Sequence, residues 1–198
     1  MKDQDIRSVL KAELLRKYAG DDNTLILDEL GVRHGMARLD LVVVNHRLHG
    51  YEIKSDLDSL IRLPDQIKIF SSVTDRMTLV VGYRHAYRAL EMVPDWWGVR
   101  LAEPNGASGS VVLNNARAPR DNPCVDINAQ VALLWRDEAL AMLEEVGAAN
   151  GVRSKSRAAI YQRLVEVSKS DFLPVRIRQQ LRLRKAWRVA ERQTSCGD

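Results

Sequence analysis

A carboxylate interrupts the most apolar β-prone run of this chain. The run extends from Arg38 to Val44, and Asp40 stands inside it among leucine and valine residues. An ionised carboxylate in such a strand costs several kcal/mol of folding free energy unless a cation or hydrogen-bond donors meet it. The fold therefore has to bring polar partners to Asp40, and this requirement limits how the neighbouring segments can be arranged.

The next β-prone segment carries suitable partners. After a turn over residues 45–50, the segment Gly50–Lys54 places Glu52 and Lys54 two positions apart, so both side chains point to the same face of a strand. If the two strands pair through this short turn, the same face can hold Asp40. Two carboxylates and one ammonium group then converge at the end of a sheet.

Such a group suits hydrolysis of a phosphodiester bond. The carboxylates of Asp40 and Glu52 and a strand carbonyl, that of Ile53, offer hard oxygen ligands to Mg²⁺, for which Mn²⁺ can substitute. The metal would polarise the phosphate and lower the pKa of a bound water. Lys54 would orient that water or stabilise charge in the transition state. The alternative is that Glu52 and Lys54 form a solvated surface pair.

The hydrophobic periodicity predicts an α/β fold. Helices are expected over residues 3–18, 59–73 and 85–92, and strands over residues 24–30, 38–44, 50–54, 77–82 and 97–101. In this α-β-β-β-α-β-α-β order, the first three strands form an antiparallel meander and a helical crossover follows. We expect a mixed central sheet with helices on both faces.

Composition divides the chain into three regions. Residues 1–103 contain the predicted sheet. Residues 104–128 are rich in Gly, Pro, Asn and Ala, which predicts a loop or a ragged hairpin. Residues 129–198 are expected to form a C-terminal α-helical extension. Its three helices are predicted over residues 131–146, 155–167 and 173–190.

Charge is distributed unevenly between these regions. Residues 151–198 carry 12 Lys and Arg against 4 Asp and Glu, a net +8, while the rest carries 18 against 22, a net −4. A basic tail on an acidic body favours a polyanionic partner, DNA first. The arginines expected to bind DNA are Arg178, Arg182, Arg184 and Arg188. A helical lid with solvated arginines and a protein-interaction domain with a basic docking helix remain the alternatives.

The sequence also indicates a cellular compartment. No apolar run approaches the roughly 18 residues of a membrane span, so no membrane partner is expected. The first residues carry acids and do not resemble a secretion signal. Cys124 and Cys196 lie far apart and outside any metal-binding spacing. We therefore expect a protein of the reducing cytoplasm without a disulfide framework.

Asp40 followed by Glu52-Ile53-Lys54 resembles the core motif of the PD-(D/E)XK nuclease superfamily. The resemblance covers residues 3–102, although Leu39 stands where the superfamily name has Pro. It extends to a bacterial subgroup of MmcB-type DNA-repair nucleases. It implies a restriction-endonuclease-like core and a Mg²⁺-dependent deoxyribonuclease acting in repair, recombination or conflict with phages and mobile elements. It also allows a homodimer. The alternative is a nuclease-fold protein that binds nucleic acid without cutting it.

The same resemblance implies roles for three more residues. Glu29 on the preceding strand would support the metal, Gln66 would hold the attacking water or a DNA phosphate, and Glu13 would add a metal ligand from the first helix. Each has a plainer interpretation. Glu29 and Gln66 would be solvated, and Glu13 would pair with Lys17 at i,i+4. Asp58, just before the second predicted helix, is expected to cap it.

Overall fold

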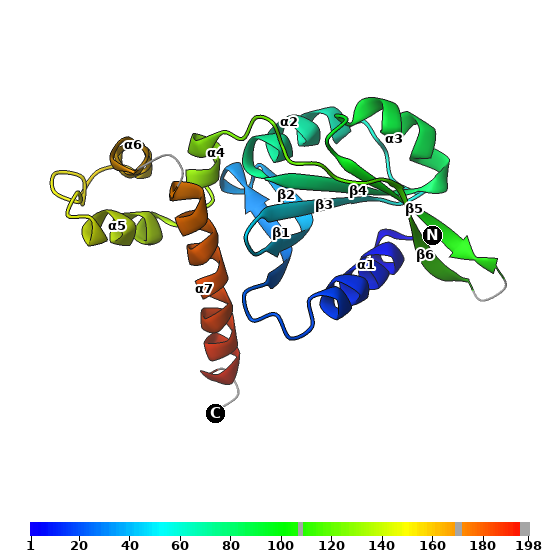
Figure 1. Cartoon of the computed structure of the whole chain (residues 1–198), viewed down its shortest axis with the longest axis horizontal. Coiled ribbons are helices and arrows are strands. Elements are labelled where there is room, and N and C mark those ends of the chain that lie inside the picture. The colour runs from blue at the N-terminus through cyan, green and yellow to red at the C-terminus, as the bar shows by residue number, and fades with distance from the viewer. Residues whose placement is uncertain (107–108, 169–171, 195–198) are drawn as a thin grey trace.

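Six strands form one mixed sheet in the computed structural model, which describes residues 1–106, 109–168 and 172–194 (Figure 1). The helices and strands are α1 (Asp3–Lys17), β1 (Leu25–Val32), β2 (Ala37–Val44), β3 (Leu48–Lys54), α2 (Leu63–Val73), β4 (Arg76–Gly82), α3 (Ala86–Met92), β5 (Gly98–Asn105), β6 (Ser110–Arg117), α4 (Ile127–Val131), α5 (Arg136–Glu145), α6 (Arg157–Val167) and α7 (Leu173–Thr194). Two 3-10 turns, η1 (Arg33–Gly35) and η2 (Tyr83–His85), precede β2 and α3. The α/β class and the predicted order of the first eight helices and strands are confirmed.

The strands lie in the sheet in chain order, from β1 to β6. β1, β2 and β3 pair antiparallel, as the predicted meander requires. β3, β4 and β5 pair parallel, and α2 and α3 provide the crossovers that parallel neighbours need. The carboxyl ends of β3 and β4 therefore lie at the same end of the sheet, and a loop follows each of them.

Helices cover both faces of the sheet. On one face, α1 buries Ile6, Leu10 and Leu14, which recur every four residues, against the sheet. The other face packs against α2, α3 and the C-terminal helices (Figure 1). Pro64 at the first turn of α2 suits a helix start because its missing N–H would have no partner there.

One expected region is confirmed in part, and one expected helix is wrong. Of the loop or ragged hairpin expected over residues 104–128, the structure has the hairpin: β5 continues to Asn105 and pairs antiparallel with β6, the sixth strand of the sheet, with a register shift at Val99/Arg100. Most side chains of β6 are exposed, which hid its period-two signal in the sequence. The helix expected over residues 131–146 is interrupted after α4. At the start of α5, the Trp135 N–H donates to the Glu138 carboxylate at 2.6 Å, which gives α5 its own N-terminus.

The C-terminal helices share the core of the sheet. Leu173, Ile177 and Leu181 of α7 are buried in the same apolar cluster as the residues of β1 to β5 on that face. The extension is therefore continuous with the sheet and not separately cored. Among the described helices, none has both the length and the apolar character needed to cross a membrane.

A shared core predicts cooperative unfolding. Leu181 is fully buried and Leu183 is 61% exposed on the same helix. We expect Leu181→Ala to lower the free energy of unfolding of the whole chain by about 2–5 kcal/mol, because a cavity forms in the common core. Leu183→Ala is the matched control and should change it by less than about 0.5 kcal/mol. Urea unfolding followed by tryptophan fluorescence and by circular dichroism should show one coincident transition, and a separate early transition in either signal would contradict the shared core.

Candidate active site

β2 and β3 separate where the motif begins. Their antiparallel ladder runs from Val44 opposite Leu48 to Leu41 opposite Tyr51, and it ends one pair before Asp40 would face Glu52. Beyond the end of this ladder, the Asp40 carboxylate accepts the Ile53 N–H at 2.7 Å. The acid inside the apolar run thus has a donor from the neighbouring strand, and the separation of the strands opens a polar site.

Arg7 of α1 provides the second partner of Asp40. Its guanidinium donates to the Asp40 carboxylate at 2.6 Å and to the Asp40 carbonyl at 2.8 Å, and it also contacts Asp3 at 3.3 Å. Sequence reasoning missed Arg7 because it lies 33 residues before Asp40. Its position beside Ile6, on the stripe that α1 buries, is the one signal that could have indicated it.

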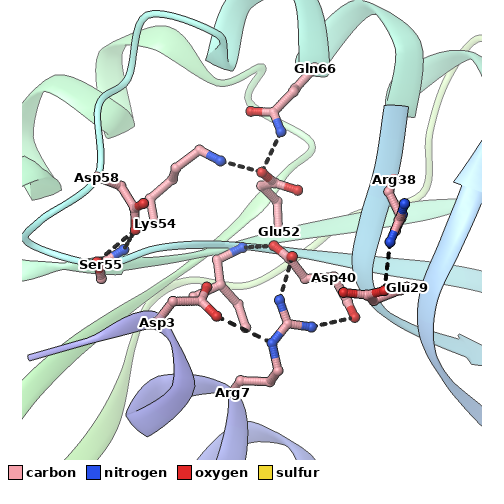
Figure 2. A network of polar contacts seen from close by, with 11 residues as sticks. Asp3, Arg7, Glu29, Arg38, Asp40, Glu52, Lys54, Ser55, Asp58 and Gln66 are labelled. Carbon is pink, nitrogen blue, oxygen red and sulfur yellow. Dashed lines mark hydrogen bonds and ion pairs between the residues drawn. The ribbon is translucent and has the colours of Figure 1, made fainter. Parts of the chain in front are cut away.

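Glu52 lies between Lys54 and Gln66, with Asp40 beside it (Figure 2). One Glu52 oxygen accepts from the Lys54 ammonium and, at 2.6 Å, from the Gln66 amide. The side chain of Glu52 is 2% exposed and that of Lys54 is 8% exposed, so the pair is shielded from water. The structure therefore brings together Asp40, Glu52, Lys54 and Gln66.

Two buried oxygens at this site lack hydrogen-bond donors. They are Glu52 Oε2 and the side-chain carbonyl oxygen of Gln66. Burial first, and the charge of Asp40 second, raise the pKa of Glu52 from 4.5 to about 7 against the opposing effects of Lys54 and Gln66. Buried acceptors without donors are costly, so the site offers unused electron pairs to a cation or a proton.

These groups face an open pocket of about 550 Å³. The pocket is lined by Asp3, Arg7, Gly35, Met36, Ala37, Arg38, Asp40, Glu52, Ile53, Lys54, Asp58, Arg62, Asp65, Gln66 and Ile69. The acidic side chains come from β2, from β3, from the loop before α2 and from the first turns of α1 and α2. The arginines line the same pocket. A polyanionic ligand would thus meet both cations and metal-ligand oxygens here.

The donor set fits Mg²⁺. Among the residues that the structure describes, no group of three or more His, Cys, Asp or Glu side chains is arranged to hold a metal ion. Mg²⁺ needs fewer, because it keeps several waters and binds through one or two carboxylates. Asp40 and Glu52 would supply the carboxylates, and Gln66 an amide oxygen. In an extended strand the N–H and C=O of one residue point to the same side, so the Ile53 carbonyl faces the gap that Asp40 fills.

Other candidate acids lie elsewhere. Glu29 forms an exposed ion pair with Arg38 at 2.7 Å and is not among the residues that line the pocket (Figure 2). Its positive φ of 55° turns the backbone of β1 locally. Glu13 pairs with Arg100 of β5 at 2.7 Å and not with Lys17.

The expected helix cap is also absent at Asp58. Its carboxylate accepts the N–H of Ser55 at 2.7 Å and the hydroxyl of Ser55 at 2.6 Å. α2 begins only at Leu63, so Asp58 lies too far ahead to cap it. It instead closes the loop that follows Lys54, and thereby fixes the chain directly behind the site.

The arginines expected to bind DNA have partners within the chain. Arg178 donates to Asp75 at 3.1 Å, and Arg182 donates to the carbonyl of Asn23 at 2.7 Å. Arg184 donates to Glu138 at 2.6 Å and to a backbone carbonyl of the α4–α5 connection. The Arg188 side chain lies outside the described residues. Three of the four arginines therefore attach α7 to the rest of the fold.

Comparison with known proteins places the chain in a family. A family model described as bacteriophage P4 protein cII matches residues 1–193, which include the site strands and α7. The chain belongs to this family. It is similar to Protein cII of Enterobacteria phage P4, with 33% identity over 108 residues, 54% of this chain and 40% of the relative. The match thus spans less than half of that cII protein's length. No solved structure matches this cII-family chain.

The buried carboxylate predicts a pH-dependent stability. The pKa of Glu52 is higher in the folded chain than in the unfolded chain, so its contribution to stability is complete below about pH 4.5 and is lost as the pH rises through about 7. Between about pH 5 and pH 8, the metal-free protein should lose up to about 3 kcal/mol of unfolding free energy relative to Glu52→Gln, which cannot titrate. Urea unfolding in EDTA measures this. Parallel pH profiles of the two proteins would show that Glu52 is not perturbed.

Proposed function

We propose that this chain is a Mg²⁺-dependent nuclease that hydrolyses phosphodiester bonds in DNA. One observation carries the proposal. Asp40, Glu52 and Lys54 meet at one end of the sheet, and the buried Glu52 Oε2 beside them has no hydrogen-bond donor. A structural ion pair needs no such spare acceptor, whereas a metal ligand does.

The fold supports a restriction-endonuclease-like core. An antiparallel meander from β1 to β3 is followed by the α2 crossover to parallel β4, and α1 covers the opposite face. In the PD-(D/E)XK nucleases that the motif resembles, the acid and the Glu-x-Lys pair occupy the second and third strands. Asp40 lies on β2, and Glu52 and Lys54 lie on β3, which agrees with that arrangement.

Each residue has a role in this proposal. Asp40 and Glu52 would hold the metal together with the Ile53 carbonyl, and a bound Mg²⁺ or Mn²⁺ would supply an activated water and a Lewis acid. Lys54 would stabilise charge on the phosphate in the transition state. Gln66 fixes one Glu52 oxygen, so the other oxygen keeps its orientation toward the metal. Glu29 is given no role in this set, because it pairs with Arg38 and does not line the pocket.

Arg7 would compete with a metal ion for the Asp40 carboxylate. In the metal-free chain, its guanidinium neutralises Asp40 through the 2.6 Å contact. A cation held by Asp40 would compete with this contact, and Arg7, which lines the pocket, would then have hydrogen-bond donors available. Arginine donors match phosphate geometry well, so Arg7 would hold the substrate phosphate once the metal has displaced it.

A biological setting follows from the family. The similar relative comes from phage P4, and its name, Protein cII, specifies no reaction. This origin favours conflict with phages or mobile elements, or the life of a mobile element itself, over cellular DNA repair. The match covers only 40% of that relative. Any activity of the longer protein can therefore be assigned to this chain only as part of this proposal.

Removal of the ammonium group should abolish cleavage without unfolding the chain. We expect Lys54→Met, which keeps the aliphatic stem, to lower the rate of cleavage of labelled DNA at least about 100-fold, because charge stabilisation in the transition state is lost. Asp40→Asn should abolish cleavage at all Mg²⁺ and Mn²⁺ concentrations, since a metal ligand is lost. EDTA should stop the wild-type reaction.

A matched control separates this role from loss of an ion pair. Lys11 also pairs with a carboxylate, that of Asp28, but on the exposed surface. Lys11→Met should therefore cleave DNA at the wild-type rate. If Lys54→Met retains full activity while remaining folded by thermal melting, or if purified wild type cuts none of single-stranded, duplex, flapped or nicked DNA with either metal, the nuclease proposal is wrong.

A further inference from the structure

Exposed apolar side chains lie on the segments that follow β3 and β4 and on the turn before β2, and one of them, Met36, lines the polar pocket. We call these residues the apolar rim: Met36, Leu57, Ile61, Tyr83 and Tyr87. Ile61 is 87% exposed and Tyr87 78%. Scattered apolar side chains on a surface are ordinary, but several around one site indicate a ligand that covers them.

Three of these residues belong to the segments that form the pocket wall. Met36 follows η1 and lines the pocket directly. Leu57 and Ile61 lie in the loop between β3 and α2, next to the pocket-lining residues Asp58 and Arg62. This loop is held in shape because Asp58 bonds to Ser55. Its apolar side chains are thus presented to solvent from an ordered segment.

The two tyrosines are connected to the same end of the sheet. Lys54 pairs with Val81 in the parallel register of β3 and β4, and η2 starts two residues after Val81. Asp56, two residues after Lys54, accepts the N–H of Arg84 at 3.1 Å. Any Cβ at position 82 would collide with Asp56, so Gly82 permits this contact. The turn η2, which carries Tyr83, is therefore fixed to the loop that follows Lys54, and α3, which carries Tyr87, follows η2 directly.

Two arginines accompany the tyrosines. The stretch Tyr83–Leu90 contains Arg84 and Arg88, and the acids next to it are Glu91 and Asp56. Arg84 and Arg88 are exposed, and each directly follows one of the two exposed tyrosines. A Tyr-Arg pair repeated after four residues places aromatic faces and cations together on one surface. Aromatic faces stack with bases, and arginines bind phosphates or stack as well.

We propose that the apolar rim binds unpaired bases, so that the substrate class of this site is DNA with single-stranded ends, flaps or gaps. The inference rests on the proposed nuclease function and specifies its substrate. An intact duplex hides its base faces in the stack and presents phosphates and polar groove edges. Leu57, Ile61 and the tyrosines would find little to contact on it. Unpaired bases expose the apolar faces that such side chains cover.

Binding of labelled oligonucleotides tests the proposal without cleavage. Fluorescence anisotropy in EDTA would compare a single strand, a blunt duplex and a duplex with a single-stranded overhang, at one salt concentration. We expect wild type to bind the single strand and the overhang at least about tenfold more tightly than the blunt duplex. The double variant Tyr83→Ala/Tyr87→Ala should lose at least about tenfold in affinity for the single strand, and little for the blunt duplex.

Phe172 offers a matched control, because it is an exposed aromatic residue beside α6 and α7 and outside the pocket lining. Phe172→Ala should bind all three probes like wild type. Equal wild-type binding of blunt duplex and single strand, or an unchanged affinity of the tyrosine variant, would overturn the rim proposal while cleavage by wild type still supported the nuclease. Absence of both binding and cleavage in wild type would instead overturn both.

Discussion

The arrangement of the candidate active site depends on the buried carboxylate of Glu52. It is almost fully removed from water, one of its oxygens is held by Lys54 and Gln66, and the other has no donor. Leaving a buried acceptor unsatisfied costs free energy of folding, which selection for stability alone would remove. The arrangement is explained if that oxygen is a ligand, and the raised pKa of Glu52 is the electrostatic expression of the same constraint.

The architecture supplies the surroundings that this carboxylate needs. The ladder between β2 and β3 ends just before Asp40 and Glu52 would face each other, which brings a second carboxylate close without a direct cross-strand pair of acids. α1 crosses the open end and contributes Arg7 to Asp40, and α2 contributes Gln66 to Glu52. The hydrophobic core behind these side chains is closely packed, so the polar groups have few other positions available.

Local sequence patterns predicted much of this arrangement, because they depend on neighbours along the chain. Period-two spacing put Glu52 and Lys54 on one face, and the short turn before them made the pairing with the Asp40 strand the natural one. Contacts between distant segments were beyond such patterns. Arg7 reaches Asp40 from α1, and Arg178, expected from the sequence to bind DNA, reaches Asp75 over 103 residues. Glu29 resembled a metal ligand only through its order in the sequence. In the structure its carboxylate forms an ion pair with Arg38.

Direct titration with Mn²⁺ tests the central claim that these carboxylates form a metal site. Calorimetry at about pH 8, where Glu52 is ionised, should show one site in wild type and none in Glu52→Gln. Arg7→Gln should bind Mn²⁺ more tightly, because the guanidinium no longer competes for Asp40, whereas Arg16→Gln, altered at an exposed position of the same helix, should match wild type. Wild type that binds no Mn²⁺, or Glu52→Gln that binds it as well as wild type, would contradict the account.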